Sequence, residues 1–300
     1  MAKLIECVPN FSEGRDRAVV DKITAPFDRR EGVKLLDVQT DGDHNRMVVT
    51  AIGTPPGIRD AVLDAMAQAV ALIDMTRHQG QHPRMGAVDV VPFIPLQEST
   101  MDEAVALSGE VAREAATRFD LPVFLYEHSA TAPHRVSLAE IRKGQFEGMA
   151  AKLEDPRWQP DFGPRRVHPS AGVTAMGARA PLVAFNVNLG TDRADIADAI
   201  ARKVRHIGGG LRYCKAMGVT LEDRSQVQVS MNMTDFNRTA LYQALELIRL
   251  EAGRFGVPVV GSEVVGLTPM QALIDCAAFY LGLENFRPDQ VLEHHLLNGL

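Results

Sequence analysis

Cysteines, long apolar runs and blocks of basic residues are all scarce in this sequence, and each shortage excludes a class of protein. The 3 cysteines among 300 residues share no short spacing, so the sequence predicts neither a disulfide framework nor a CxxC metal site. No apolar stretch approaches the roughly 20 residues that a membrane-spanning helix needs. The net charge is −6, and no basic run is longer than two residues, as at Arg165-Arg166. Neither nucleic acid nor an anionic membrane is therefore expected as a partner.

Apolar residues, by contrast, are plentiful. They make up 46% of the chain and charged residues 23%, a balance typical of a folded globular protein. A single core stops growing near roughly 250–300 residues, so two compact units are at least as plausible as one. Glu6 interrupts the segment where a signal peptide needs an apolar run, and we expect a cytoplasmic protein.

Hydrophobic spacing predicts the same order of strands and helices in both halves. In the first half the expected strands are 3–9, 33–38, 46–52 and 88–94, and the expected helices are 16–28 and 57–74. In the second half the strands are 181–189, 211–220, 225–232 and 257–264, and the helices are 193–206 and 238–255. Each half has the order β-α-β-β-α-β. We predict an α+β fold with two ferredoxin-like subdomains, each an antiparallel sheet covered by helices.

Further elements surround this repeat. They are a helix at 101–118, a strand at 122–126, a helix near 137–153 and a terminal helix at 270–282. Ser12 and Asp192 are the expected N-caps of the first helix in each half. Residues 155–178 are rich in Pro, Gly and Arg without a regular period, which indicates a linker or a binding loop. We therefore place the first unit at 1–178 and the second at 179–300.

The segment Arg77–Gly86, with the sequence Arg-His-Gln-Gly-Gln-His-Pro-Arg-Met-Gly, is the densest polar feature of the chain. It joins a predicted helix to a predicted strand, a junction where loops commonly carry function. Histidine has an unperturbed pKa of about 6.5, which suits proton transfer near neutrality. Arginine offers a planar fork for a carboxylate. The alternative is a solvated helix end, with its histidines near the negative pole of the helix dipole.

His78 and His82 also permit a metal interpretation, because they stand four residues apart. On a helix this spacing places both rings on one face, where they could ligate zinc. However, Gly80 and Pro83 disfavour a helix, the Glu of an HExxH motif is absent, and no third ligand has a diagnostic spacing. The residues favour catalysis over metal binding.

A second polar cluster runs from Asp37 to Arg46. It is only loosely similar to a calcium loop and lacks the closing Glu. A structural turn is about as good an interpretation as a catalytic role for most of its members, including Asp41. Asn45 and Arg46 stand out, because they begin a strand at the sheet end where we expect the histidine segment.

Three further stretches could let a ligand approach. One begins at Asn10, in Asn-Phe-Ser-Glu-Gly, and another is the triple glycine at 208–210. The triple glycine fits neither phosphate-binding fingerprint, so a flexible turn is the better interpretation. Asn186 and Asn188 stand two apart on a strand and point to the same side. Polar side chains are costly to bury unpaired, which favours a site wall here.

Five segments resemble the glutamate formiminotransferase family, in order and across nearly the whole chain. They are residues 6–14, 78–90, 184–189, 228–232 and 258–267. The resemblance implies transfer of a formimino group from N-formimino-L-glutamate to N5 of tetrahydrofolate, a step of histidine degradation. It implies tetrahydrofolate as co-substrate, two ferredoxin-like subdomains with a folate cleft between them, and a homodimer; no metal is expected. Some animal members carry a fused cyclodeaminase; we expect a stand-alone form without one.

The resemblance also implies roles for single residues. The family's catalytic histidine falls on His82, which we expect to accept the N5 proton and to return a proton to the glutamate nitrogen. The folate-contacting loop falls on 163–172. Arg46 and Arg84 are our candidates for gripping donor carboxylates. The residues expected to bind donor or folate are Asn10, Asp41, Asn45, Arg46, His78, Arg84, Gly163, Pro164, Gly172, Asn186 and Asn188.

Two departures from the family pattern keep alternatives open. Gln39 stands where some relatives carry a second acid, and the stretch Arg165–His168 is more basic than expected. A related donor such as N-formylglutamate therefore stays possible. So do two other classes: a metal-dependent amidohydrolase that uses His78 and His82, and a non-catalytic ligand-binding protein.

Overall fold

The computed structural model describes residues 2–221 and 224–293. The fold is mixed α/β with two sheets, and the chain divides into two compact units at residues 179 and 180. Each unit has its own sheet and its own hydrophobic core. Within the described ranges, no helix is both long and apolar enough to cross a membrane.

The first unit contains a seven-stranded sheet. Its strands are β1 (Ile5–Cys7), β2 (Asn10–Phe11), β3 (Val33–Asp41), β4 (Arg46–Gly53), β5 (Val88–Pro95), β6 (Val123–Leu125) and β7 (Thr174–Ala178). β3 pairs with β4, β1 and β2 lie between β4 and β5, and β7 lies between β5 and β6. The pairs β5–β7 and β6–β7 are parallel. The prediction of a purely antiparallel sheet is wrong at this end, because a helical crossover joins β5 to β6 and returns the chain to the same end of the sheet.

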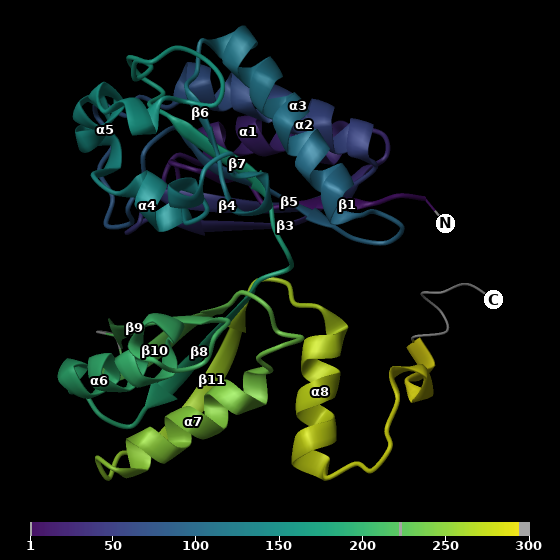
Figure 1. Cartoon of the computed structure of the whole chain (residues 1–300), viewed down its shortest axis with the longest axis vertical. Helices are drawn as coiled ribbons and strands as arrows, with labels where there is room; N and C mark the ends of the chain where they lie inside the picture. Colours follow the sequence, from purple (N-terminus) through teal and green to yellow (C-terminus); the bar gives the residue numbers. More distant parts are fainter. Residues whose placement is uncertain (1, 222–223, 294–300) are drawn as a thin grey trace. The chain divides into compact units, whose positions relative to one another are not determined.

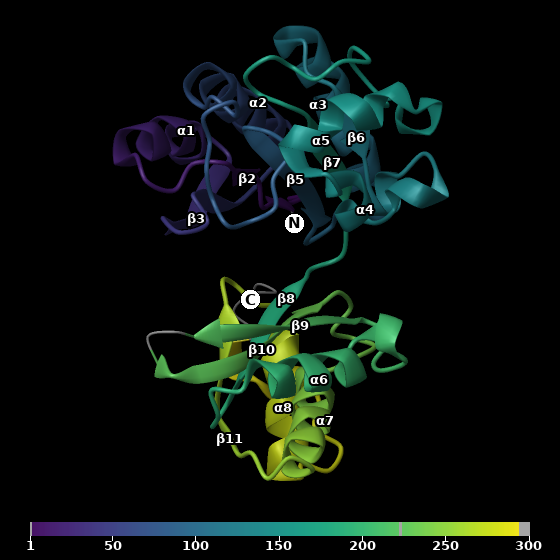
Figure 2. The ribbon, with the colours of Figure 1, turned by 90° about the vertical axis from the view of Figure 1, so that its left-hand side faces the viewer.

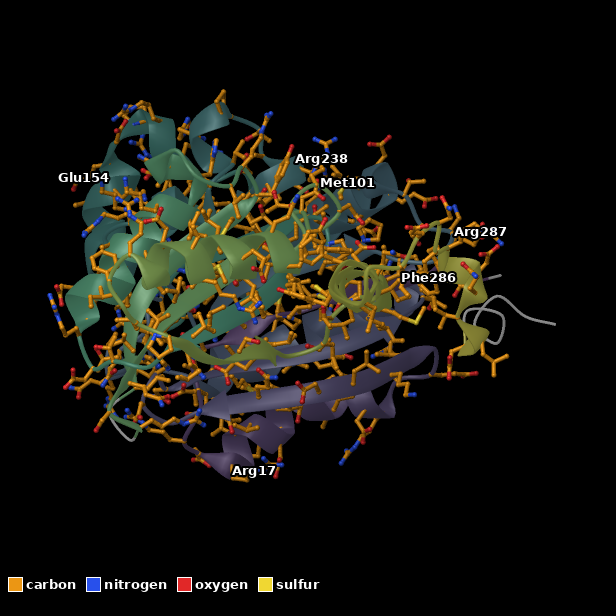
Figure 3. All side chains as sticks on the ribbon, turned by 90° about the horizontal axis from the view of Figure 1, so that it is seen from below. Arg17, Met101, Glu154, Arg238, Phe286 and Arg287 are labelled. Carbon is orange, nitrogen blue, oxygen red and sulfur yellow. The ribbon has the colours of Figure 1, made fainter. Side chains whose placement is uncertain are left out.

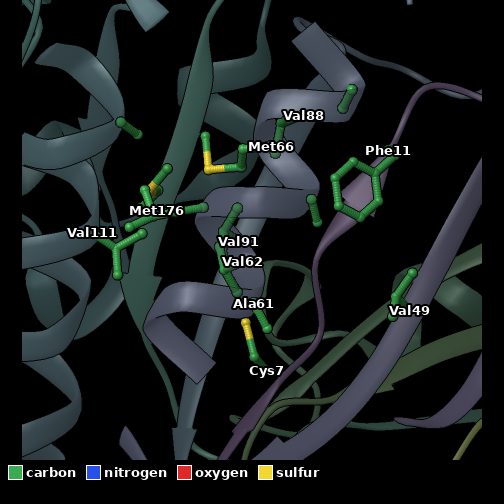
Figure 4. Packing of buried hydrophobic residues seen from close by; sticks show 14 of the residues in the cluster. Cys7, Phe11, Val49, Ala61, Val62, Met66, Val88, Val91, Val111 and Met176 are labelled. Atoms are coloured by element: carbon green, nitrogen blue, oxygen red, sulfur yellow. The ribbon is translucent and has the colours of Figure 1, made fainter. Parts of the chain in front are cut away.

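Three long helices pack on one face of this sheet, as Figures 1 and 2 show. They are α1 (Arg17–Arg29), α2 (Pro55–Leu72) and α3 (Met101–Phe119). Figure 4 shows Val62 and Met66 of α2 beside Val91 of β5 in this core. Charged side chains such as Arg17 and Glu154 project from the surface of the unit (Figure 3). The apolar stripe of each helix therefore faces the sheet, as its 3.6-residue period requires.

Two shorter helices, α4 (Leu138–Arg142) and α5 (Gln145–Glu154), cover the opposite face of the sheet at its parallel end. Ile141 of α4 and Met149 of α5 share a buried cluster with Val90. One helix was predicted here. The chain instead breaks at Gly144, whose φ of 96° is left-handed and ends the helical path. The irregular segment after α5 also contains β7, a strand that the composition of the segment did not indicate.

The N-cap prediction for Ser12 is wrong. Asp16 caps α1, and its carboxylate accepts from the N–H of Ala18 at 2.9 Å. The Ser12 hydroxyl is buried and donates to the carbonyl of Gly86 at 2.8 Å. Ser12 lies too far before the helix to reach its first N–H groups, and it fastens the start of the chain to the histidine segment instead.

The second unit contains a four-stranded antiparallel sheet in the order β11-β8-β10-β9. Its elements are β8 (Val183–Leu189), α6 (Ala194–Val204), β9 (Cys214–Leu221), β10 (Gln226–Met233), α7 (Leu241–Gly253), β11 (Val259–Val265) and α8 (Met270–Leu281). α6 and α7 pack against the face that carries Val187 and Val229. Arg193, not Asp192, is the N-cap of α6 and makes no side-chain cap bond, so the Asp192 prediction is wrong by one residue. Gly208–Gly210 form the turn after α6, where Gly209 N–H donates to the carbonyl of His206 at 2.9 Å.

Candidate active site

The histidine loop, residues 76–86, leaves α2 and enters β5, and backbone hydrogen bonds hold both of its ends. Met75 N–H donates to the carbonyl of Ser170 at 2.8 Å, and Ala87 N–H donates to that of Ala171 at 2.9 Å. A Cβ at Gly172 would lie 2.3 Å from the carbonyl oxygen of Met85, so only glycine permits this close approach. One end of the expected folate loop therefore packs against the histidine loop.

The other end of that loop lies elsewhere in the first unit. Gly163 has a φ of 84°, and a Cβ there would lie 2.1 Å from the carbonyl oxygen of Leu121. Pro164 beside it is half-buried. Within the segment, Arg165 Nε donates to the carbonyl of Leu153 at 2.7 Å. The segment is thus fixed at both glycines by close backbone packing.

A second element, the Asp41–Asn45 turn between β3 and β4, packs on the histidine loop. Gln81 N–H donates to the carbonyl of Asp43 at 3.2 Å, and Asn45 Nδ2 donates to the carbonyl of Gln79 at 3.1 Å. A Cβ at Gly80 would lie 2.1 Å from the carbonyl oxygen of His44. Asn45 has a φ of 46°, a left-handed conformation that asparagine tolerates better than most residues. The turn and the loop therefore behave as one packed body.

This packing brings His44 and His82 together. Their ring centroids are 5.9 Å apart and the rings meet edge to face at 78°. Nδ1 of His82 is buried, with no hydrogen-bond partner in residues 2–221 and 224–293. Nδ1 of His44 is hydrogen-bonded to Oδ2 of Asp41 at 2.5 Å. Two imidazoles with different surroundings thus stand side by side.

Two guanidinium groups act on His82. Arg46, the first residue of β4, donates to Oδ1 of Asn10, and its own Nε is buried without a partner in the described chain. Arg142 at the end of α4 forms an ion pair with the buried Asp89 at 2.5 Å. Burial first, and then the charges of Arg46 and Arg142, lower the pKa of His82 to about 3. The ring is therefore neutral at neutral pH, the form that accepts a proton.

His78 and Arg84 form a separate, supporting group. His78 Nε2 lies 2.9 Å from the carbonyl of Asn45, and its Nδ1 accepts from Arg84 Nε at 3.2 Å. Because a carbonyl can only accept, Nε2 carries the proton. Arg84 also holds Glu147 with two hydrogen bonds of 2.6 and 2.9 Å. Its guanidinium is thus already engaged by protein carboxylate, unlike that of Arg46.

Asn186 and Asn188 lie in the second unit and make a polar group of their own. Gln228 Nε2 donates to Oδ1 of Asn188 at 2.8 Å and to Oε1 of Glu263 at 2.9 Å. Asn186 Nδ2 donates to the same Glu263 oxygen at 3.2 Å. Both asparagines are buried on the sheet face opposite Val187.

Sequence reasoning missed Asp89, Arg142, Gln228 and Glu263. For Asp89 a signal existed, because a carboxylate inside the apolar strand Val-Asp-Val-Val needs a partner to be buried. β5 is irregular at this point, where Asn10 pairs with Val90 and Phe11 with Val88. No local signal marks Arg142, because its neighbours in space come from distant parts of the chain.

In the part of the chain that the structure describes, no group of three or more His, Cys, Asp or Glu side chains lies close enough together to hold a metal ion. Both ring nitrogens of His78 are engaged by Asn45 and Arg84.

Comparison with known proteins gives a consistent result over the whole chain. Residues 4–179 match the family model described as formiminotransferase domain, N-terminal subdomain, and residues 184–295 match that of the formiminotransferase domain. The chain is 53% identical to a glutamate formimidoyltransferase of Streptococcus pyogenes, over 99% of this chain and 100% of that protein. It is 43% identical to one of Thermoplasma acidophilum, over 98% and 97%. A formimidoyltransferase-cyclodeaminase of Rattus norvegicus is 43% identical over 95% of this chain and 53% of its own length.

The electrostatics of His82 lead to a prediction that NMR titration can check. We expect the His82 ring to titrate with a pKa of about 3, against about 6.5 in the unfolded chain. The unfolded state then binds more protons between these values, so stability falls as the pH drops from about 6.5 towards 3. In Arg46→Gln the pKa of His82 should rise, because one neighbouring cation is removed. A wild-type His82 that titrates near 6.5 would contradict this picture.

Proposed function

The chain belongs to the formiminotransferase domain family, and from this premise we infer that it is a glutamate formimidoyltransferase. It transfers the formimino group of N-formimino-L-glutamate to N5 of tetrahydrofolate, in histidine degradation. The full-length similarity to stand-alone relatives carries the identity of the reaction. The site supports acid–base chemistry, because the His82 imidazole is neutral and can accept a proton. Two guanidinium groups near it favour this neutral form.

We propose that His82 is the general base. As N5 attacks the formimino carbon, its lone pair forms the new N–C bond and its proton passes to the His82 ring. The tetrahedral intermediate then collapses when the bond from carbon to the glutamate nitrogen breaks and that nitrogen gains a proton. General acid–base catalysis of this kind contributes typically ~10²–10⁴-fold. Holding donor and folate in one site supplies further rate through proximity.

We propose that Arg46 grips a donor carboxylate. Its Nε is buried and unpartnered in the described chain, and its side chain rises from the sheet beside Asn10. Charge-assisted bonds to a carboxylate suit an arginine in such surroundings. Arg84, the other candidate, is already engaged by Glu147, so its proposed role is to hold His78. A carboxylate against Arg46 would offset one of the charges that lower the pKa of His82, making the base stronger once donor is bound.

The remaining assignments stay proposals, each with its own support. Residues 163–172 are proposed to contact folate, since Gly172 packs on the histidine loop. Asn186 and Asn188 are proposed to bind substrate through the polar group they form with Gln228. The order β11-β8-β10-β9, with two helices on one face, supports a ferredoxin-like second unit; β3-β4-β1-β5 supports the same core in the first. The homodimer is proposed from the family resemblance, and the cytoplasmic location from the sequence pattern.

One assay tests the proposed function against its rivals. Purified protein is treated with EDTA and incubated with formiminoglutamate, with and without tetrahydrofolate, and then with N-formylglutamate as donor. We expect 5-formiminotetrahydrofolate to form in the folate arm alone, at a rate that EDTA does not change. Folate-independent loss of the formimino group that EDTA abolishes would indicate the amidohydrolase. Faster transfer from N-formylglutamate would show that the formyl compound is the preferred donor. Binding without turnover would refute the transferase proposal.

His82→Ala tests the base directly. The variant should lose turnover by about 10²–10⁴-fold, because the N5 proton loses its acceptor, while tetrahydrofolate binding by calorimetry stays within a few-fold of wild type. His134→Ala is the matched control: this exposed histidine bonds the carbonyl of Arg157, outside the site, and its loss should leave turnover unchanged. Wild-type turnover in His82→Ala would refute the assignment.

A further inference from the structure

The reaction needs a proton removed from N5 and a proton delivered to the departing glutamate nitrogen. His82 is the proposed acceptor of the N5 proton. With its pKa lowered to about 3 by burial and two arginines, its conjugate acid is disfavoured until substrate charges compensate. The site contains a second imidazole beside it that the proposed mechanism has so far left unused.

A carboxylate orients the His44 ring, an arrangement that is common for histidines that transfer protons. Its Nδ1 is hydrogen-bonded to Oδ2 of Asp41, while the other Asp41 oxygen accepts the backbone N–H groups of Asp43 and His44 at 2.9 and 2.8 Å. The carboxylate therefore fixes both the turn and the ring. Such a carboxylate fixes the tautomer and leaves Nε2 as the exchanging atom. His44 is partly exposed, with 45% of its side chain accessible, so a substrate atom can reach it.

The position of this pair relative to His82 is tightly defined. The His44 carbonyl packs against Gly80, and its neighbour Asn45 bonds the carbonyl of Gln79 and accepts from Gly14 N–H at 3.0 Å. The two rings sit on elements that share these contacts, and their centroids are 5.9 Å apart. That separation leaves both rings able to reach neighbouring atoms of one tetrahedral intermediate.

We propose that His44, oriented by Asp41, is a second catalytic residue, which protonates the departing glutamate nitrogen while His82 accepts the N5 proton. This inference rests on the proposed function and divides its two proton transfers between two rings. The N5–C bond forms as the N5 proton moves to His82. The bond from carbon to the glutamate nitrogen then breaks, and its electron pair takes the proton from Nε2 of His44. Exchange with solvent returns His82 to its neutral and His44 to its protonated form, so each cycle closes.

The charges around the two rings support this division. Arg46 and Arg142 face His82, which favours its neutral form, whereas the Asp41 carboxylate faces Nδ1 of His44. Burial raises the pKa of Asp41, but hydrogen bonds from the backbone and the ring of His44 outweigh this effect. The net result is a lowered pKa, which keeps this carboxylate charged. The other charged groups at the turn are Asp43, which is exposed, and Arg15, which donates to the carbonyl of Gly42 at 2.7 Å. One ring thus faces two cations and the other faces a carboxylate, and such a difference in surroundings is typical of base and acid partners.

Rescue by added imidazole tests the proposal. His44→Ala should lower kcat by about 10²-fold or more and change KM for both substrates by less than about threefold. Imidazole should restore part of the rate, and more at pH 6 than at pH 8, because His44 supplies a proton. Rescue of His82→Ala should show the opposite preference, because a base needs the neutral ring. Asp41→Asn should lower kcat less, and Asp43→Asn, which removes a charge from the same exposed turn, should leave it unchanged.

The outcomes separate the two levels of proposal. If wild type transfers no formimino group, the proposed function fails. If wild type is active and His44→Ala keeps its kcat, or is rescued better at pH 8, only the role of His44 fails. His44→Gln is measured as a second variant in case alanine prevents folding, because the polar side chain of glutamine suits the turn. A folded His44→Gln with wild-type kcat would equally overturn the proposal.

Discussion

The site depends on one constraint, the close backbone packing between the Asp41–Asn45 turn and the histidine loop. At Gly80 the two chains approach so closely that a single methyl group would overlap the carbonyl of His44. Asn45 accepts from the N–H of Gly14, donates to the carbonyl of Gln79 and accepts from His78, so two segments distant in sequence converge on it. Backbone contacts this close leave no room for the turn and the loop to move towards each other. The relation between the two imidazoles is therefore set by the fold before any substrate arrives.

Charge is the second determinant. Two partly buried arginines, Arg46 and Arg142, lie around the neutral ring of His82, and the buried carboxylate of Asp89 is paired with Arg142. An excess of positive charge at a partly buried site favours an anionic ligand, and the donor carries two carboxylates. The proposed mechanism uses this imbalance twice, to hold the donor and to make His82 a stronger base once donor is bound. Asp89 also accepts the N–H of Met85 at 2.8 Å, which ties the charge group to the histidine loop.

Much of the fold follows from local periodicity, and the rest does not. The alternation in residues 46–52 and the helical spacing in 57–74 predict β4 and α2 closely, because each element buries one face. The parallel end of the first sheet is different. β7 lies in a segment rich in Pro, Gly and Arg, and its pairing with β5 is decided by long-range packing. Likewise, the polar content of residues 77–86 reveals a functional loop, but the approach of Arg142 depends on Ile141 and Met149 packing beneath α4 and α5.

The most direct test of this account is the turnover of Gly80→Ala compared with Gly42→Ala. Both substitutions add one methyl group to the paired loops, but at Gly42 nothing lies within 4 Å of the new Cβ, whereas at Gly80 it meets the His44 carbonyl at 2.1 Å. A displacement of about 1 Å in a reacting group costs roughly 10²-fold in rate. We predict such a loss of kcat for Gly80→Ala, with circular dichroism showing a folded protein, and none for Gly42→Ala. Equal, undiminished turnover in both variants would contradict the claim that this packing sets the geometry of the site.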